Sequence, residues 1–274
     1  MLLGIFVSAV LFASPQRGNS AAKSLVFSDD DLAPTAADYV QSGLVNFWDG
    51  IENADWGIHT DDKSIGWVDL AGNAANIVLT DTTVFWESTS LTRVGTWGRV
   101  LAYPTIDLTD PLSERTFEFV VSAEDLPSEP ASTYYFWALK GTSSYANRLL
   151  WTKRSQDSIP YIWGTIRASA GNAWLGTSED LLRPCTVSMV GTSEPSTVER
   201  NWGYYYFNGI KTSSGLFGGN PYPEGTDMAL FAAVRNWPAS NTIRFHSIRI
   251  YNRALTAEEV AHNHLIDRLR FNLP

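Results

Sequence analysis

The chain has 274 residues and a formal net charge of −9, and 44% of its residues are hydrophobic while 18% are charged. A chain of this size buries about 70–75% of the surface that its unfolded form exposes, so it needs neither a disulfide nor a metal ion to fold. Binding to nucleic acid takes a basic face, and the acidic balance and the lack of a long Lys/Arg run argue against that partner.

An apolar stretch opens the chain over residues 1–13. Its length is typical of the core of a signal peptide, although no positive charge precedes it, and it is too short to span a bilayer as a helix. A buried strand or an attachment segment is the alternative interpretation. Residues 14–34 are mostly polar and are interpreted as a linker, which leaves 35–274 as the folded domain. No other stretch predicts a transmembrane span.

After the linker, residues 35–42 predict one or two helical turns, with Thr35 as the N-cap and Gly43 as the stop. The pattern then changes to short apolar or alternating runs separated by turn-forming residues. Twelve such runs predict strands at 44–48, 77–80, 84–86, 99–103, 116–122, 134–139, 148–151, 160–167, 186–190, 202–207, 228–234 and 242–251. Since no long helices lie between them, the predicted fold is an all-β antiparallel sandwich.

Two local signals stand near the end of the chain. Asn208-Gly209 predicts a tight hairpin turn, because both residues tolerate a positive φ. Thr256 and Glu259 form a capping-box pattern, which predicts the start of a short C-terminal helix. The apolar stripe of that helix is predicted at Val260, Ala261, Leu265 and Leu269.

The chain has one cysteine and many aromatic residues. Cys185 cannot form an internal disulfide, so it is interpreted as a buried apolar thiol, or else as a free or intermolecular one. Eleven Trp, eleven Tyr and thirteen Phe fit packed strands first of all, but such rings also stack on sugars. The candidate sugar-stacking residues are Trp151, Trp163, Trp174 and Trp202, with Asn147, Arg148, Arg154 and Asn172 as hydrogen-bonding partners. We expect at least two of these tryptophans to be exposed on one surface.

Two stretches carry a resemblance to a known family. They are 43–53 (GLVNFWDGIEN) with 67–73 (WVDLAGN), and 248–259 (IRIYNRALTAEE), with the hairpin at 206–209 between them. In this order they resemble the concanavalin A-like lectin/glucanase superfamily, in the laminin G-like form common in bacterial surface and phage structural proteins. The resemblance covers about residues 38–271 with a divergent middle. It implies an antiparallel two-sheet jelly-roll sandwich with a short C-terminal helix.

The resemblance also bears on chemistry. Glucanases of the superfamily carry E-x-D-x-E or E-x-D-x-x-E on one strand, which holds two carboxylates about 5–5.5 Å apart for retaining hydrolysis. This sequence has no such run, so no catalytic residue is expected and a glycoside hydrolase is the lesser alternative. Relatives often bind calcium through rim-loop aspartates. The corresponding candidates here are Asp49, Asp55, Asp61 and Asp62, for which a solvated acidic loop is the other interpretation.

The leading hypothesis is a non-catalytic carbohydrate-recognition or adhesion domain that is extracellular, on a cell surface or a virion. Its partner would be a glycan or a cell-surface polysaccharide. The alternative is a structural or decoration protein of a phage virion, in which the sandwich assembles with other virion or surface proteins.

Overall fold

The structure is a computed structural model of the chain. It describes residues 33–52, 66–73, 77, 79, 84–94, 100–102, 113–124, 132–140, 145–153, 161–165, 173–177, 179–197, 200–217, 228–230 and 242–274. The apolar segment 1–13 and almost all of the linker lie outside these ranges, so their interpretation stays a prediction. Among the described residues, no helix has both the length and the apolar character needed to cross a membrane.

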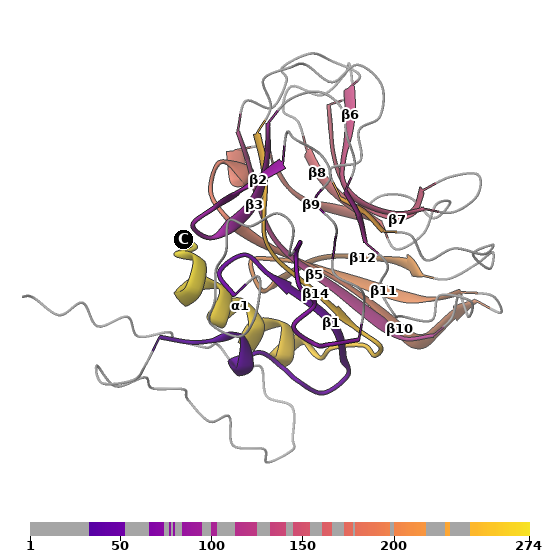
Figure 1. Cartoon of the computed structure of the whole chain (residues 1–274). Helices are drawn as coiled ribbons and strands as arrows, with labels where there is room; N and C mark the ends of the chain where they lie inside the picture. Colours follow the sequence, from indigo (N-terminus) through magenta and orange to yellow (C-terminus); the bar gives the residue numbers. More distant parts are fainter. Residues whose placement is uncertain are drawn as a thin grey trace, which may run out of the picture. The chain divides into compact units, whose positions relative to one another are not determined.

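The strands form two antiparallel sheets (Figure 1). The eight-stranded large sheet runs in the order β12 (Ile210–Phe217), β11 (Arg200–Phe207), β10 (Cys185–Thr197), β5 (Arg115–Glu124), β14 (Thr242–Tyr251), β3 (Ser90–Val94) and β2 (Val84–Glu87), with β1 (Leu44–Asp49) also paired to β14. The six-stranded small sheet runs in the order β4 (Val100–Ala102), β13 (Met228–Leu230), β6 (Ser132–Lys140), β7 (Tyr145–Lys153), β8 (Tyr161–Thr165) and β9 (Ala173–Thr177). Three helices complete the described elements: the 3-10 helices η1 (Ala36–Asp38) and η2 (Glu179–Leu182), and α1 (Ala257–Phe271).

The predicted all-β antiparallel fold with a short C-terminal helix is confirmed at this level. Three strands were not predicted: β3, β9 and β12. β12 lies at the end of the large sheet and reads Ile-Lys-Thr-Ser-Ser-Gly-Leu-Phe, which has little alternation. Edge strands often carry polar or charged residues, which discourage pairing of the exposed backbone with another chain. The turn that precedes it is confirmed, since Asn208 and Gly209 have φ values of 48° and 73°.

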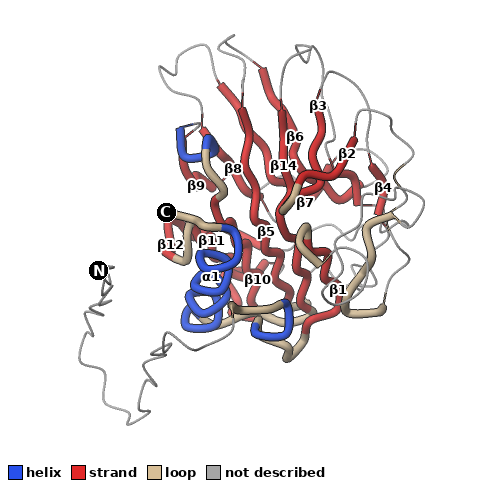
Figure 2. The backbone as a smooth tube through the Cα atoms, turned by 60° about the vertical axis from the view of Figure 1, so that its left-hand side comes forward, coloured by secondary structure: helices blue, strands red, loops and turns tan. Residues whose placement is uncertain are grey.

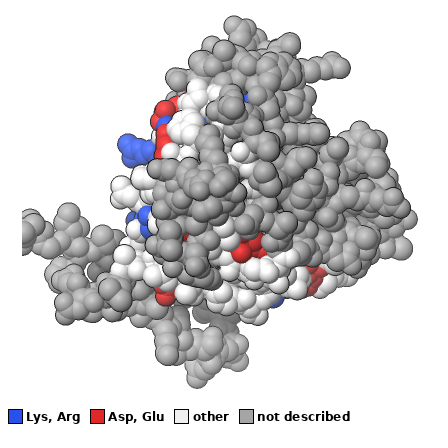
Figure 3. Space-filling view, viewed as in Figure 1, with Lys and Arg blue, Asp and Glu red and all other residues white. Residues whose placement is uncertain are grey.

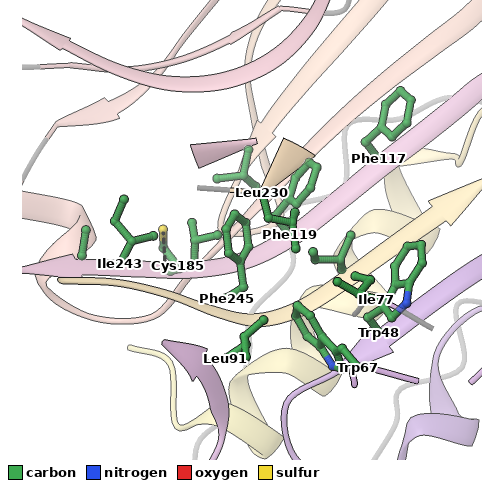
Figure 4. Close-up of a cluster of buried hydrophobic side chains, with 14 of the residues drawn as sticks. Trp48, Trp67, Ile77, Leu91, Phe117, Phe119, Cys185, Leu230, Ile243 and Phe245 are labelled. Carbon is green, nitrogen blue, oxygen red and sulfur yellow. Dashed lines mark hydrogen bonds between the residues drawn. The ribbon is translucent and has the colours of Figure 1, made fainter. Parts of the chain in front are cut away.

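The core lies on one face of the large sheet. Along β5, Phe117 and Phe119 belong to the central apolar cluster, whereas Glu118 points to the opposite face. Figure 4 shows Leu230 of β13 beside Phe119, so the small sheet packs against this same cluster. Cys185 is buried in it, as one of the two interpretations predicted, and burial raises the pKa of its thiol.

The opposite face of the large sheet is partly covered by α1 (Figure 2). The predicted capping box is present: Glu259 N–H donates to Thr256 Oγ1 at 3.2 Å and Thr256 N–H donates to Glu259 Oε2 at 2.9 Å. The predicted apolar stripe is wrong, because Ala261 and Leu269 are exposed and Leu265 is only half-buried. The buried side of α1 consists of Val260, Asn263, Ile266, Asp267 and Phe271. Polar residues belong there because the sheet beneath presents charged side chains.

Loss of the α1 cap gives a prediction of moderate size. Thr256→Ala removes the side-chain acceptor at the helix N-terminus and is expected to lower the free energy of unfolding by about 1 kcal/mol. Urea denaturation of the full chain measures this change. Thr256→Ser is the matched control, because serine keeps the hydroxyl and should leave stability nearly unchanged. Equal losses for both variants would contradict the capping role.

The turn at residues 69–73 is hydrogen-bonded to β1. The Asp69 carboxylate accepts from Ala71 N–H at 3.1 Å and from Asn73 N–H at 3.0 Å, the hydrogen-bond pattern of an Asx turn. It also accepts from Phe47 N–H at 2.7 Å and from the Asn46 side chain at 3.0 Å. This motif therefore defines the fold locally.

Candidate functional site

A buried polar cluster lies between the large sheet and α1. Arg249 of β14 binds Asp267 of α1 through two bonds of 2.8 Å and Glu118 of β5 through one of 3.1 Å, and all three side chains are fully buried. The further members are Tyr39, Thr186, Ser188, Tyr251 and Asn263, which hydrogen-bond to these three groups or to one another. Burial raises the pKa of Glu118, although Arg249 opposes this shift. Since α1 covers it, the cluster holds the helix on the sheet and is closed to a ligand.

Asp49, one of the predicted calcium ligands, lies in a second buried ion pair. Its carboxylate accepts from Arg270 at 3.0 and 3.1 Å and from the backbone N–H groups of Ile51 and Glu52 at 2.9 Å. Arg270 also binds the Glu52 carboxylate at 3.0 Å. A guanidinium thus satisfies the oxygens that a cation would need.

The other three calcium candidates, Asp55, Asp61 and Asp62, lie outside the described residues. Within the described ranges, no three His, Cys, Asp or Glu side chains are grouped as metal ligands. Calcium binding therefore stays a prediction.

Another pair of carboxylates flanks Arg244 on β14. Glu87 of β2 accepts from the Arg244 guanidinium at 2.6 Å and Glu124 of β5 at 2.9 Å. The bond from Arg244 is one of the interactions that lower the pKa of Glu87 against the opposing effect of burial. A glycosidase needs one carboxylic acid whose pKa is raised so that it can protonate the leaving group. Glu87 departs from that requirement because its shift is in the other direction.

The aromatic candidates fall mainly on the small sheet, where strand pairing fixes the face of each position. Leu230 of β13 is fully buried in the central cluster. Leu230 pairs with Trp137 of β6, and Trp137 pairs with Leu149 of β7. Directly paired residues lie on the same face of a sheet. These three positions therefore mark the core-facing side of the small sheet.

The next residue along β7 starts the opposite face. Leu150 pairs with Trp163 of β8, and Trp163 pairs with Trp174 of β9. Because successive strand residues alternate between faces, this row lies on the side of the small sheet away from Leu230. Arg148 is two residues from Leu150 and lies on that same side. We call this side the outer face of the small sheet.

The other predicted residues lie elsewhere. Asn147 and Trp151 each lie two residues from Leu149, so they occupy the same, core-facing side of β7. Arg154 and Asn172 lie outside the described residues. The structure thus brings Trp163, Trp174 and Arg148 to one face.

Trp202 belongs to the large sheet, on the face that α1 partly covers. Its neighbour two positions along, Tyr204, donates to Glu194 at 2.6 Å, and the Lys211 ammonium lies 3.7 Å from the Tyr204 ring centroid. Tyr205, the next residue along β11, is buried in the central cluster, which sets Trp202 and Tyr204 on the opposite side. Trp202 is half-buried there. On the face shown in Figure 3, acidic and basic side chains of the described residues are interspersed.

These features define an all-β protein with two antiparallel sheets, one of them covered by a helix. No protein-family model and no curated protein sequence matches the chain. Solved structures do match in fold. One is Trypanosoma rangeli sialidase, 17% identical with a TM-score of 0.52, over 87% of this chain and 34% of that chain. Others are the receptor binding domain of botulinum neurotoxin type G (12% identical, TM-score 0.58, 82% and 52% covered) and the binding domain of serotype D (12%, 0.57, 81% and 51%).

The chain spans about a third of the sialidase and about half of the toxin domains. At these identities the likeness is one of fold. It agrees with an all-β sandwich. The ligand and activity of this chain have to be argued from its own residues.

Proposed function

We propose that this chain is a non-catalytic carbohydrate-recognition or adhesion domain, extracellular and displayed on a cell surface or a virion. In this proposal the sandwich is a concanavalin A-like, laminin G-like jelly roll, and the outer face of the small sheet holds the glycan. The partner is a glycan or a cell-surface polysaccharide.

One observation carries the proposal: Trp163 and Trp174 are direct cross-strand partners on the side of the small sheet away from the core. Paired strand positions have Cβ atoms about 4.5–5.5 Å apart, and in this proposal the two tryptophans together offer the sugar one apolar stacking surface. Sugar rings present C–H faces that stack on such platforms, while the indole N–H remains a polar handle.

The similar solved structures support the class and no more. Among them are a sialidase described in complex with sialic acid and two toxin domains described as binding domains. The non-catalytic part of the proposal is supported by this chain's described carboxylates around Arg249, Arg270 and Arg244, which are held in ion pairs.

Glycan-array binding followed by titration of the full chain tests the proposal. Trp163→Ala and Trp174→Ala are each expected to weaken glycan binding about tenfold or more, since loss of one stacked ring removes about 1.4 kcal/mol or more. Trp202→Ala is the matched control, because it removes an indole from the other sheet. It should leave the affinity within about twofold.

Several outcomes would overturn the proposal. Binding that survives both substitutions in the small sheet would place the glycan elsewhere. Release of reducing sugar that a single Glu→Gln substitution abolishes would make the chain a glycoside hydrolase. Absence of glycan binding, together with assembly of the chain on virion or surface proteins, would favour the structural alternative.

A further inference from the structure

The small sheet differs from the rest of the chain in its charge. Its six strands contain three charged residues, and all are basic: Lys140, Arg148 and Lys153. The whole chain has 29 acidic and 20 basic residues, so about one residue in nine is acidic. The large sheet, in contrast, mixes both signs, with Glu118 and Glu124 beside Arg244 and Arg249. A net negative protein therefore contains one sheet without carboxylates.

One of these cations lies next to the tryptophan pair. Arg148 pairs with Thr165 of β8, two residues beyond Trp163 on the same strand. Arg148 and Trp163 thus occupy adjacent strands on the outer face, at diagonal positions. The backbones of diagonal positions lie about 7–8 Å apart, a distance that a long side chain can span. The strand register therefore puts a basic position diagonally next to the paired tryptophan positions on the same face.

We propose that the glycan bound by this face is anionic, a polymer that carries carboxylate or sulfate groups, and that Arg148 binds the anion while Trp163 and Trp174 stack on the sugar. This inference rests on the proposed function and narrows its ligand class. A guanidinium fork binds a carboxylate or sulfate through two parallel hydrogen bonds, which adds geometric selectivity to charge.

The net negative charge of the chain bears on where an anionic glycan could bind. A protein of net charge −9 repels a polyanion in general, so binding needs a local surface where repulsion is absent. The six strands of the small sheet contain no Asp or Glu, and in this proposal they supply it.

Two matched pairs of polymers test the inference on the full chain. Polygalacturonate and its fully methyl-esterified form share a backbone and differ in carboxylate charge, and dextran sulfate and dextran differ in sulfate. The charged member of at least one pair is expected to bind about tenfold or more tightly than its neutral partner. This preference should shrink as NaCl is raised from 50 to 300 mM.

Substitution then tests whether Arg148 causes the preference for the charged polymer. Arg148→Gln is expected to abolish the preference for the charged polymer, a loss of about tenfold, while binding to the neutral polymer is unchanged. Arg268→Gln is the control, since it removes an exposed cation from α1 and should change neither.

Equal or stronger binding of the neutral members, with loss on Trp163→Ala, would overturn the anionic ligand and leave glycan recognition standing. Failure of all four polymers, while a neutral glycan binds on the array, would overturn the anionic ligand alone. Failure on the array as well, or equal Arg148-dependent binding of a single-stranded oligonucleotide, would overturn both.

Discussion

Arg249→Leu is expected to lower the free energy of unfolding by about 3–5 kcal/mol. Within the described ranges, Arg249 is the one cation that contacts both Glu118 and Asp267, and all three side chains are fully buried. Without the guanidinium, the two carboxylates would face each other in the protein interior. Removing one member of a buried ion pair leaves its partners charged or forces them to take up protons, and either costs stability.

The loss should be seen as an earlier midpoint in urea denaturation at pH 7. Arg268→Ala is the control, because Arg268 is exposed on the same helix, and a change within about 0.5 kcal/mol is expected. A loss below about 1 kcal/mol for Arg249→Leu would mean that the cluster does not hold α1 on the sheet.

Acidification from pH 7 to pH 4 is expected to remove about 3 kcal/mol of stability through His246 alone. Burial lowers the pKa of His246 from 6.5 to about 4. Its Nδ1 lies 3.1 Å from the Thr89 carbonyl oxygen, which can only accept, so Nδ1 carries the proton and Nε2 accepts from Ser122 at 3.0 Å. The Phe271 ring covers the imidazole, with ring centroids 5.7 Å apart.

The sign follows from these two pKa values. Below pH 6.5 the unfolded chain takes up a proton on His246 that the folded chain refuses until about pH 4. Stability from this group is therefore fully present above pH 6.5, and each pH unit below it costs about 1.4 kcal/mol until the folded pKa is reached. Arg244 nearby disfavours the imidazolium further, whereas Glu87 and Asp267 favour it.

Other groups titrate in the same range, so the difference between two proteins isolates the effect. His246→Gln keeps hydrogen-bonding capacity without the charge. The stability advantage of the parent chain over this variant is expected to shrink by about 3 kcal/mol between pH 7 and pH 4. Parallel stability curves over that interval would show that His246 titrates alike in both states.

The strand pattern predicted most of the fold because buried and exposed residues alternate along a strand that has one face in the core. The last strand, predicted at 242–251, matches β14 (Thr242–Tyr251), with Ile248 and Ile250 in the core. The pattern failed where sheet contacts override local sequence. β12 is polar because it lies at an edge, and the buried side of α1 is polar because Arg249 lies beneath it.

The site was predictable in part. Sequence composition singled out Trp163 and Trp174, but only the pairing register shows that they are partners and that Trp151 lies on the other side. Asp49 illustrates the limit, since its partner Arg270 is 221 residues away in the sequence. The i, i+4 spacing of Asn263 and Asp267 on α1 was the signal that could have indicated a buried polar helix face.

Oxidative footprinting with mass spectrometry tests most directly whether the outer face of the small sheet binds glycan. The proposal predicts that Trp163 and Trp174 are modified in the free chain far faster than Trp151, and that a bound glycan protects these two together. Modification of Trp151 with protection of Trp163 and Trp174 in the free chain, or glycan-induced protection confined to the large sheet, would contradict it.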